Sequence, residues 1–96
     1  MATGQGTATI NFGAAPGANE ASVAVTGQGA ISATSKVEAY VMAEASVDHT
    51  LQDHTYFQLF ATLTCDAPTA GTGFNIYGRS PHKLTGQWTV RWVWAD

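Results

Sequence analysis

The stretch Leu84-Thr-Gly-Gln-Trp-Thr-Val-Arg-Trp-Val-Trp-Ala-Asp96 decides the fold class. Its large apolar residues occupy every second position: Trp88, Val90, Trp92 and Trp94. Because successive side chains of a β-strand point to opposite faces, these four share one face. An apolar row of this size needs cover from a second sheet or from a partner subunit. The stretch therefore predicts a buried strand in a layered β protein.

Further β-strand patterns recur along the chain, with turn residues between them. We expect strands over residues 7–12, 20–26, 36–44, 55–65 and 74–78, and connections over 13–19, 66–73 and 79–83. Outside the tryptophan strand, the side chains expected in the core are Phe57, Leu59, Leu63, Phe74 and Ile76. The pattern predicts an all-β fold, a small antiparallel β-sandwich of about six strands. Jelly-roll and immunoglobulin-like connectivities are both compatible with it.

The segment Lys36-Val-Glu-Ala-Tyr-Val-Met-Ala-Glu44 fits two structures. Strict alternation places Val37 and Ala39 on one face, as a strand requires. A helix remains an alternative, because Thr34 or Ser35 can serve as its N-cap. We expect a strand.

The composition indicates one domain over residues 1–96 with an unusually neutral surface. Charged residues make up 11% of the chain, against about 25% in typical domains. This fits either a secreted or adhesin-like protein with a Thr/Ser-rich surface or a subunit covered in an assembly. Residues 1–6 are expected to form an extended N-terminal arm. Such an arm binds a neighbour by adding a strand to its sheet edge.

Several classes of protein are disfavoured by the sequence. The basic residues form no run, so we expect no nucleic-acid partner: Lys36, Arg79, Lys83 and Arg91. Cys65 is the single cysteine and cannot form an intrachain disulfide. No apolar run approaches about 18 residues, so no membrane span is expected. The N-terminus lacks the basic and apolar regions of a signal peptide, so we expect synthesis in a cytoplasm.

The segment Val47-Asp-His-Thr-Leu-Gln-Asp-His-Thr55 is the best candidate for chemistry. It repeats Asp-His-Thr, and His and Asp are ordinary zinc ligands. However, the spacing of five residues separates His49 from His54 on a regular strand or helix, so that only a loop brings them together. A polar connection in which Asp side chains cap turns is favoured, and a metal or catalytic site is the alternative. Ser46, His49 and Asp53 lack the Gly-x-Ser-x-Gly elbow of hydrolases. We expect no catalytic residue, no metal site and no cofactor.

Three tyrosines, Tyr40, Tyr56 and Tyr77, stand opposite the apolar columns of their segments. Exposed tyrosines stack on sugars or fill protein interfaces, although ordinary half-buried sheet positions are an equal alternative. The residues expected at an interface are Thr3, Gln5, Thr7, Tyr40, His49, Asp53, His54, Tyr56, Tyr77 and Arg91.

From about residue 7 to its end, the chain resembles a group of small bacteriophage virion structural proteins. The resemblance is carried by the order of five segments: Ala21-Ser-Val-Ala-Val-Thr-Gly-Gln28, Val37-Glu-Ala39, Asp48-His-Thr-x-x-Asp-His54, Gly71-Thr-Gly-Phe-Asn-Ile-Tyr77 and Leu84–Trp94. Related sequences often carry Glu before the second His, where this chain has Gln52-Asp53. This departure weakens the metal alternative further.

The resemblance implies a β-sandwich subunit without enzyme activity. The expected role is a capsid decoration (cement) or head-fibre protein that stabilises the virion, made in the host cytoplasm. Its expected partners are further copies of itself, as a dimer or trimer, and other virion proteins such as the major capsid protein. A tail component and a carbohydrate-binding module for host attachment are the alternatives, and a metal-dependent enzyme using His49 and His54 is a third.

Overall fold

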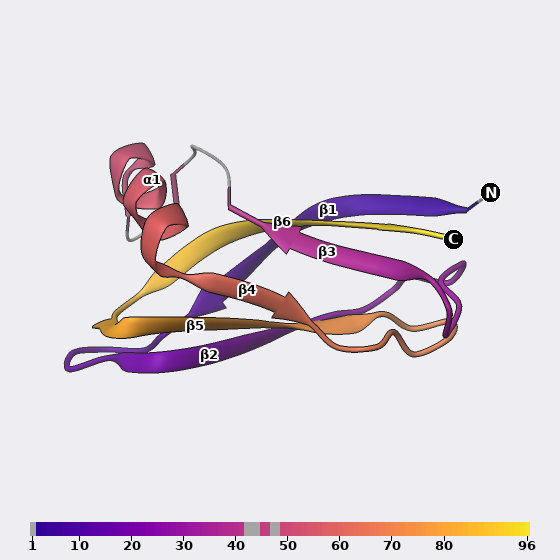
Figure 1. The fold of residues 1–96 in the computed structure, drawn as a ribbon, viewed down its shortest axis with the longest axis horizontal. Coiled ribbons are helices and arrows are strands. Elements are labelled where there is room, and N and C mark those ends of the chain that lie inside the picture. The colour runs from indigo at the N-terminus through magenta and orange to yellow at the C-terminus, as the bar shows by residue number, and fades with distance from the viewer. Residues whose placement is uncertain (1, 42–44, 47–48) are drawn as a thin grey trace.

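The computed structural model describes residues 2–41, 45–46 and 49–96. Two three-stranded antiparallel sheets form two layers, and one helix lies at one end of them (Figure 1). The elements in chain order are β1 (Thr3–Asn11), β2 (Ala18–Val25), β3 (Lys36–Tyr40), α1 (Leu51–Phe60), β4 (Thr62–Cys65), β5 (Phe74–Leu84) and β6 (Gln87–Ala95). The predicted all-β fold is confirmed, with six strands among the described residues.

Sheet A has the strand order β1-β6-β3, and sheet B has the order β2-β5-β4. The first and last strands are therefore neighbours, and their pairing runs from Thr3 opposite Ala95 to Asn11 opposite Gln87. Both termini lie at the same end of the sandwich (Figure 1). The central strands β5 and β6 are flanked on both sides, which leaves four strands at sheet edges.

The tryptophan row of β6 is buried on the inner face of sheet A, as its alternation predicts. Its neighbours on β1 are small where its rings are large. Gly4 pairs with Trp94, and a Cβ added to Gly4 would lie 2.3 Å from the indole nitrogen Nε1. Gly6 pairs with Trp92, and a Cβ there would lie 2.6 Å from its ring. The two glycines thus leave the space that the two indole rings fill.

Sheet B closes the core from the other side. The predicted core residues that are buried are Phe57, Phe74, Ile76, Trp88, Val90, Trp92 and Trp94. Leu63 is half-buried and packs against them. The two sheets approach closely at Gly78, where a Cβ would lie 2.9 Å from Cδ1 of Ile10.

The strand predicted over residues 55–65 is wrong in its first half. Residues 51–60 form α1, and only Thr62–Cys65 continue as β4. Leu59, predicted in the core, is 75% exposed because the helix turns it to solvent. The apolar residues do alternate, as in a strand. However, the capping box formed by Thr50 and Asp53 stabilises the start of a helix at this point.

Residues 79–83, predicted as a connection, lie inside β5, so that prediction is wrong as well. The proline in this stretch is tolerated because the pairing of β4 with β5 reaches only as far as Arg79, which lies opposite Thr62. Pro81, lacking an N–H group, therefore has no β4 neighbour to bond.

The strand predicted from Lys36 is confirmed as far as Tyr40, and the helical alternative is wrong. Ser35, considered as an N-cap, donates its hydroxyl to Oδ1 of Asp96 at 2.8 Å instead. The expected end of this strand, residues 42–44, lies outside the described residues, as does Asp48.

The prediction of an N-terminal arm over residues 1–6 is wrong for Thr3 to Gly6. Thr3 to Gly6 form the first half of β1 and pair with β6. The reason is the packing of the Trp92 and Trp94 rings over the two glycines, which gives this stretch a place in its own sheet. Within the described residues, no helix is both long and apolar enough to cross a bilayer.

Candidate functional site

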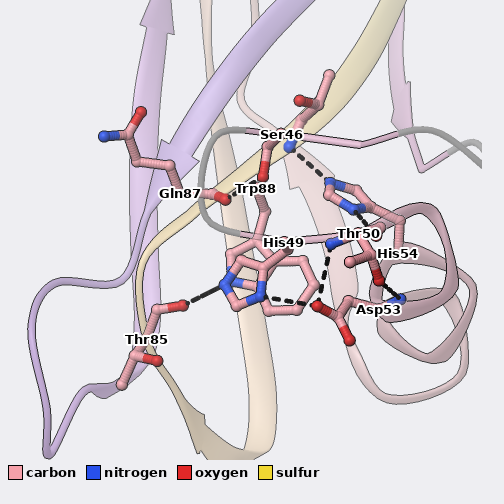
Figure 2. Close-up of polar contacts among 9 residues, drawn as sticks. Ser46, His49, Thr50, Asp53, His54, Thr85, Gln87 and Trp88 are labelled. Atoms are coloured by element: carbon pink, nitrogen blue, oxygen red, sulfur yellow. Dashed lines mark hydrogen bonds and ion pairs between the residues drawn. The ribbon is translucent and has the colours of Figure 1, made fainter.

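The start of α1 organises the cluster that the sequence marked as the best candidate for chemistry (Figure 2). The Thr50 hydroxyl accepts a hydrogen bond from the Asp53 backbone N–H at 3.2 Å. In return the Asp53 carboxylate accepts from the Thr50 N–H at 3.0 Å. This capping box satisfies two backbone donors at the helix start. The backbone bond from Thr50 is the main reason why the pKa of Asp53 is lowered.

Trp88 lies between two aromatic rings at this end of the sandwich. His49 stacks on it with ring centroids 3.5 Å apart, and Phe57 stacks with centroids 4.5 Å apart. Two parallel rings at these separations cannot share one face of the indole, so they cover opposite faces. The covered ring leaves no free platform on which a sugar could stack.

His54 is fully buried, and both of its ring nitrogens are bonded. Nε2 accepts from the backbone N–H of Thr89 at 3.0 Å. Because Nε2 accepts, Nδ1 carries the proton and donates to the Thr50 carbonyl oxygen, also at 3.0 Å. This neutral ring joins the helix start to β6. The prediction of His54 as an interface residue is wrong, since no surface of it is available to a partner.

His49 is the half-buried histidine of the pair. Its Nε2 lies 2.7 Å from the Thr85 carbonyl oxygen, to which it must donate because a carbonyl only accepts. The Trp88 indole N–H donates to the same oxygen at 3.0 Å. On the other side of the ring, Nδ1 of His49 lies 3.4 Å from Oδ2 of Asp53. Figure 2 shows the ring between these two acceptors.

The segment before His49 makes one further bond to β6 and one to His49 itself. The Ser46 hydroxyl donates to the Gln87 carbonyl oxygen at 2.6 Å. Its backbone N–H donates to the His49 carbonyl oxygen at 2.9 Å. Ser46 thus adds a hydrogen bond to the aromatic contacts that His49 and Phe57 make with this end of β6.

The geometry places the His–Asp segment in a supporting role. The centroids of the two imidazole rings are 6.5 Å apart. His49 lies in the loop before α1 and His54 in the helix, so a loop does bring the two rings near each other, as expected. Among the described residues, no three His, Cys, Asp or Glu side chains gather in a way that could hold a metal ion. The predicted capping by an Asp side chain is confirmed at Asp53, although it caps a helix where a turn was expected.

A surface hollow of about 450 Å³ adjoins the cluster. Its polar and aromatic lining includes His49, Asp53, Tyr56, His82, Lys83 and Trp88. Sequence reasoning missed His82 and Lys83, because it placed them in a connection and not in the long strand β5. No signal in the sequence brings these two residues to the helix.

Half of the predicted interface residues gather on the outer face of sheet A. They alternate with the buried rows of their strands: Thr3, Gln5, Thr7, Tyr40 and Arg91. Thr7 lies opposite Arg91, and Arg91 lies opposite Tyr40, so these three form one row across the sheet. A sequence pattern predicts the face of each residue, but only the strand order places them side by side.

The three tyrosines lie on three different surfaces of the protein. Tyr40 points outward from sheet A and Tyr77 outward from sheet B, on opposite sides of the sandwich. Tyr56 lies on α1 and is exposed. The Tyr77 hydroxyl donates to Oδ2 of Asp66 at 3.5 Å, and the guanidinium carbon of Arg79 lies 5.7 Å from its ring centroid.

Two ionisable groups near β4 have shifted pKa values. Asp66 accepts from the Asn75 backbone N–H at 2.8 Å, and that bond is the main reason for its lowered pKa. Burial is the main reason why the pKa of the Cys65 thiol is raised. Cys65 packs against the core, as the alternation predicts.

Comparison of the chain with models of protein families, with curated proteins and with solved structures found no match.

Proposed function

We propose that this chain is a non-enzymatic structural subunit of a bacteriophage particle, in the manner of a capsid decoration or head-fibre protein. It binds the particle through the outer face of sheet A. The sequence resemblance motivates the role, and the arrangement of the sandwich supplies the surface.

The outer face of sheet A is the observation that supports the proposal most. It gathers uncharged polar side chains from β1 with one exposed aromatic ring and three charged side chains: Thr3, Gln5, Thr7, Thr9, Lys36, Glu38, Tyr40 and Arg91. Interfaces are enriched in Tyr and Arg and depleted of Lys and Glu at their centre. The row of Thr7, Arg91 and Tyr40 matches this composition. Lys36 and Glu38 lie outside this row, further along β3.

The packing beneath this face also favours binding. Its three strands are anchored from below by the buried tryptophan row, so little conformational freedom remains to be lost when a partner binds. A subunit that is linked to further copies of itself needs only a modest affinity at each site, because its second contact with the particle becomes intramolecular.

The test is co-sedimentation with phage particles assembled without this chain. We expect saturable binding of the wild type and about tenfold weaker binding of Tyr40→Ala, since an exposed tyrosine at an interface centre contributes strongly. Tyr77→Ala is the matched control, because Tyr77 lies on the outer face of the other sheet. No binding of the wild type to any such particle would overturn the proposal. Equal binding by the two variants would remove sheet A as the binding face.

Carbohydrate binding is a second candidate, favoured by one observation. Tyr56 is 55% exposed beside the hollow that also holds His82 and Lys83. An exposed ring beside polar groups is a common arrangement for a sugar. Glycan-array binding that Tyr56→Ala abolishes would favour this function for host attachment. An array without binding would end it.

A further inference from the structure

The four edge strands of the sandwich differ in how well they are protected against pairing with another chain. β3 is five residues long and carries Lys36 and Glu38, and β4 is four residues long. β2 carries Glu20 and an irregular register between Ala18 and Glu20. Short length, charge and bulges are the devices by which proteins block edge pairing.

β1 has none of these devices. It is nine residues long, Thr-Gly-Gln-Gly-Thr-Ala-Thr-Ile-Asn, without charge or proline. Its register with β6 is uninterrupted from end to end. Its outward side chains, from Thr3 to Asn11, are all exposed. A long, regular and neutral edge of this kind is a template for another strand.

The hydrogen-bonding direction of each β1 residue follows from its neighbours in the ladder. The Asp96 N–H donates to the Ala2 carbonyl oxygen, and the Phe12 N–H donates to the Gly86 carbonyl oxygen. Even-numbered residues therefore direct their backbone groups to β6. Because the direction alternates along a strand, the odd-numbered residues from Thr3 to Asn11 direct theirs away from the sheet.

We propose that β1 pairs with β1 of a second copy of this chain, antiparallel and centred on Thr7. In this register Thr7 lies opposite Thr7 of the second copy, Gln5 opposite Thr9, and Thr3 opposite Asn11. Every pair of odd-numbered residues then exchanges the backbone bonds that the edge leaves open. Two three-stranded sheets become one continuous six-stranded sheet with two-fold symmetry.

The side chains of β1 complement themselves in this register. On the inner face, Gly4 lies opposite Ile10 of the second copy and Gly6 opposite Ala8, so a small residue always meets a larger one. On the outer face, hydroxyl and amide side chains meet one another and form cross-strand hydrogen bonds. A second copy is therefore the occupant that this edge fits.

The charges of the outer face also permit this pairing. The two copies of Arg91 stand three strands apart, about 14 Å at the usual spacing. This exceeds the screening length of about 8 Å at physiological ionic strength. The equivalent pairing of β3 would place Glu38 directly opposite its own copy, where like charges repel.

The first test is the solution mass by light scattering over a range of concentrations. We expect a dimer of twice 10.1 kDa that dissociates on dilution. Thr7→Lys places two ammonium groups at the two-fold axis, so its mass is expected to be that of the monomer. Ser22→Lys is the matched control, because it adds the same charge at an exposed position of β2 and should leave the dimer intact.

The second test reads the register. In a Cys65→Ser background, Thr7→Cys should form a disulfide-linked dimer on mild oxidation. Opposite residues of a bonded pair lie about 5.5 Å apart between Cα atoms, within the disulfide range of about 4.4–6.8 Å. Thr3→Cys should form no disulfide-linked dimer under the same oxidation, because the two Thr3 positions are about 27 Å apart along the strands.

Three results would overturn the proposal. One is a monomeric or trimeric wild type at every concentration. Another is a Thr7→Lys variant that has both the dimer mass and the melting temperature of the wild type. The third is cross-linking of Thr3→Cys at the rate of Thr7→Cys. Because these tests use the isolated chain, they are independent of whether it binds phage particles.

Discussion

The two ends of β6 bury their tryptophans in different ways. At one end, Trp92 and Trp94 lie over Gly6 and Gly4, their direct neighbours in the same sheet. At the other end, Trp88 pairs with Ile10, whose full side chain leaves no such space. There the indole is covered by His49 and Phe57, which come from the segment around α1.

The difference shows that one apolar row can be buried by two kinds of contact. The glycine end is closed by a neighbouring strand whose sequence fits the rings. The helix end depends on a separate segment, which stays in place through polar bonds as well as packing. We therefore expect the glycine end to be sensitive to added volume and the helix end to lost hydrogen bonds.

The largest effect is expected from His54→Ala at the helix end. It leaves the Thr89 N–H without its acceptor and opens a cavity where the fully buried ring lay, so the free energy of unfolding should fall by about 3 kcal/mol. Denaturant unfolding measures this change. His54→Gln, which retains an acceptor for Thr89, should lose clearly less. Equal losses would mean that volume, and not the hydrogen bond, matters at this end.

Gly6→Ala tests the glycine end. The new methyl group meets the Trp92 ring at 2.6 Å, and relief of this overlap should cost about 2 kcal/mol of stability. Gly29→Ala is the matched control, because nothing lies within 4 Å of its Cβ position and its backbone conformation is ordinary. Comparable thermal stability of the two variants would contradict the fit of ring to glycine.

His49→Ala should have a smaller effect, about 1–2 kcal/mol, through the lost stacking and the lost bond to Thr85. Because one face of Trp88 becomes exposed, its fluorescence should shift to longer wavelength. His49→Phe restores the stacking without the hydrogen bond and should return most of the spectral shift. An unchanged emission spectrum in His49→Ala would show that the ring does not cover Trp88.

The smallest effect is the pH dependence of the helix end. The pKa of Asp53 is lower in the folded chain than its ordinary value, mainly through the Thr50 N–H bond. Its stabilising contribution is thus present above about pH 4 and is lost as the pH falls below that value. Asp53→Asn should give a melting temperature that depends less on pH between about 2 and 5. Identical pH profiles for the two proteins would rule out this contribution.

The helix end also shows where prediction from sequence fails. The residues Phe57, Leu59 and Leu63 alternate as a strand would, and the alternation led to a strand prediction. The contrary signal was present at Thr50-Leu-Gln-Asp53, since Thr and Asp three residues apart form a capping box. The alternation of apolar residues is the more conspicuous signal, but it is misleading here because Leu59 is exposed.

The sequence by itself determined the all-β class, the face of each strand and the burial of the tryptophan row, because alternation along a strand is a local property. It also named Thr3, Gln5 and Thr7 as interface candidates, although it placed the first two in an arm. Only the tertiary structure decided that Tyr40 and Arg91 join them, and that β1 lies at an open edge. Strand order and edge exposure depend on contacts between residues far apart in the chain, which no local pattern encodes.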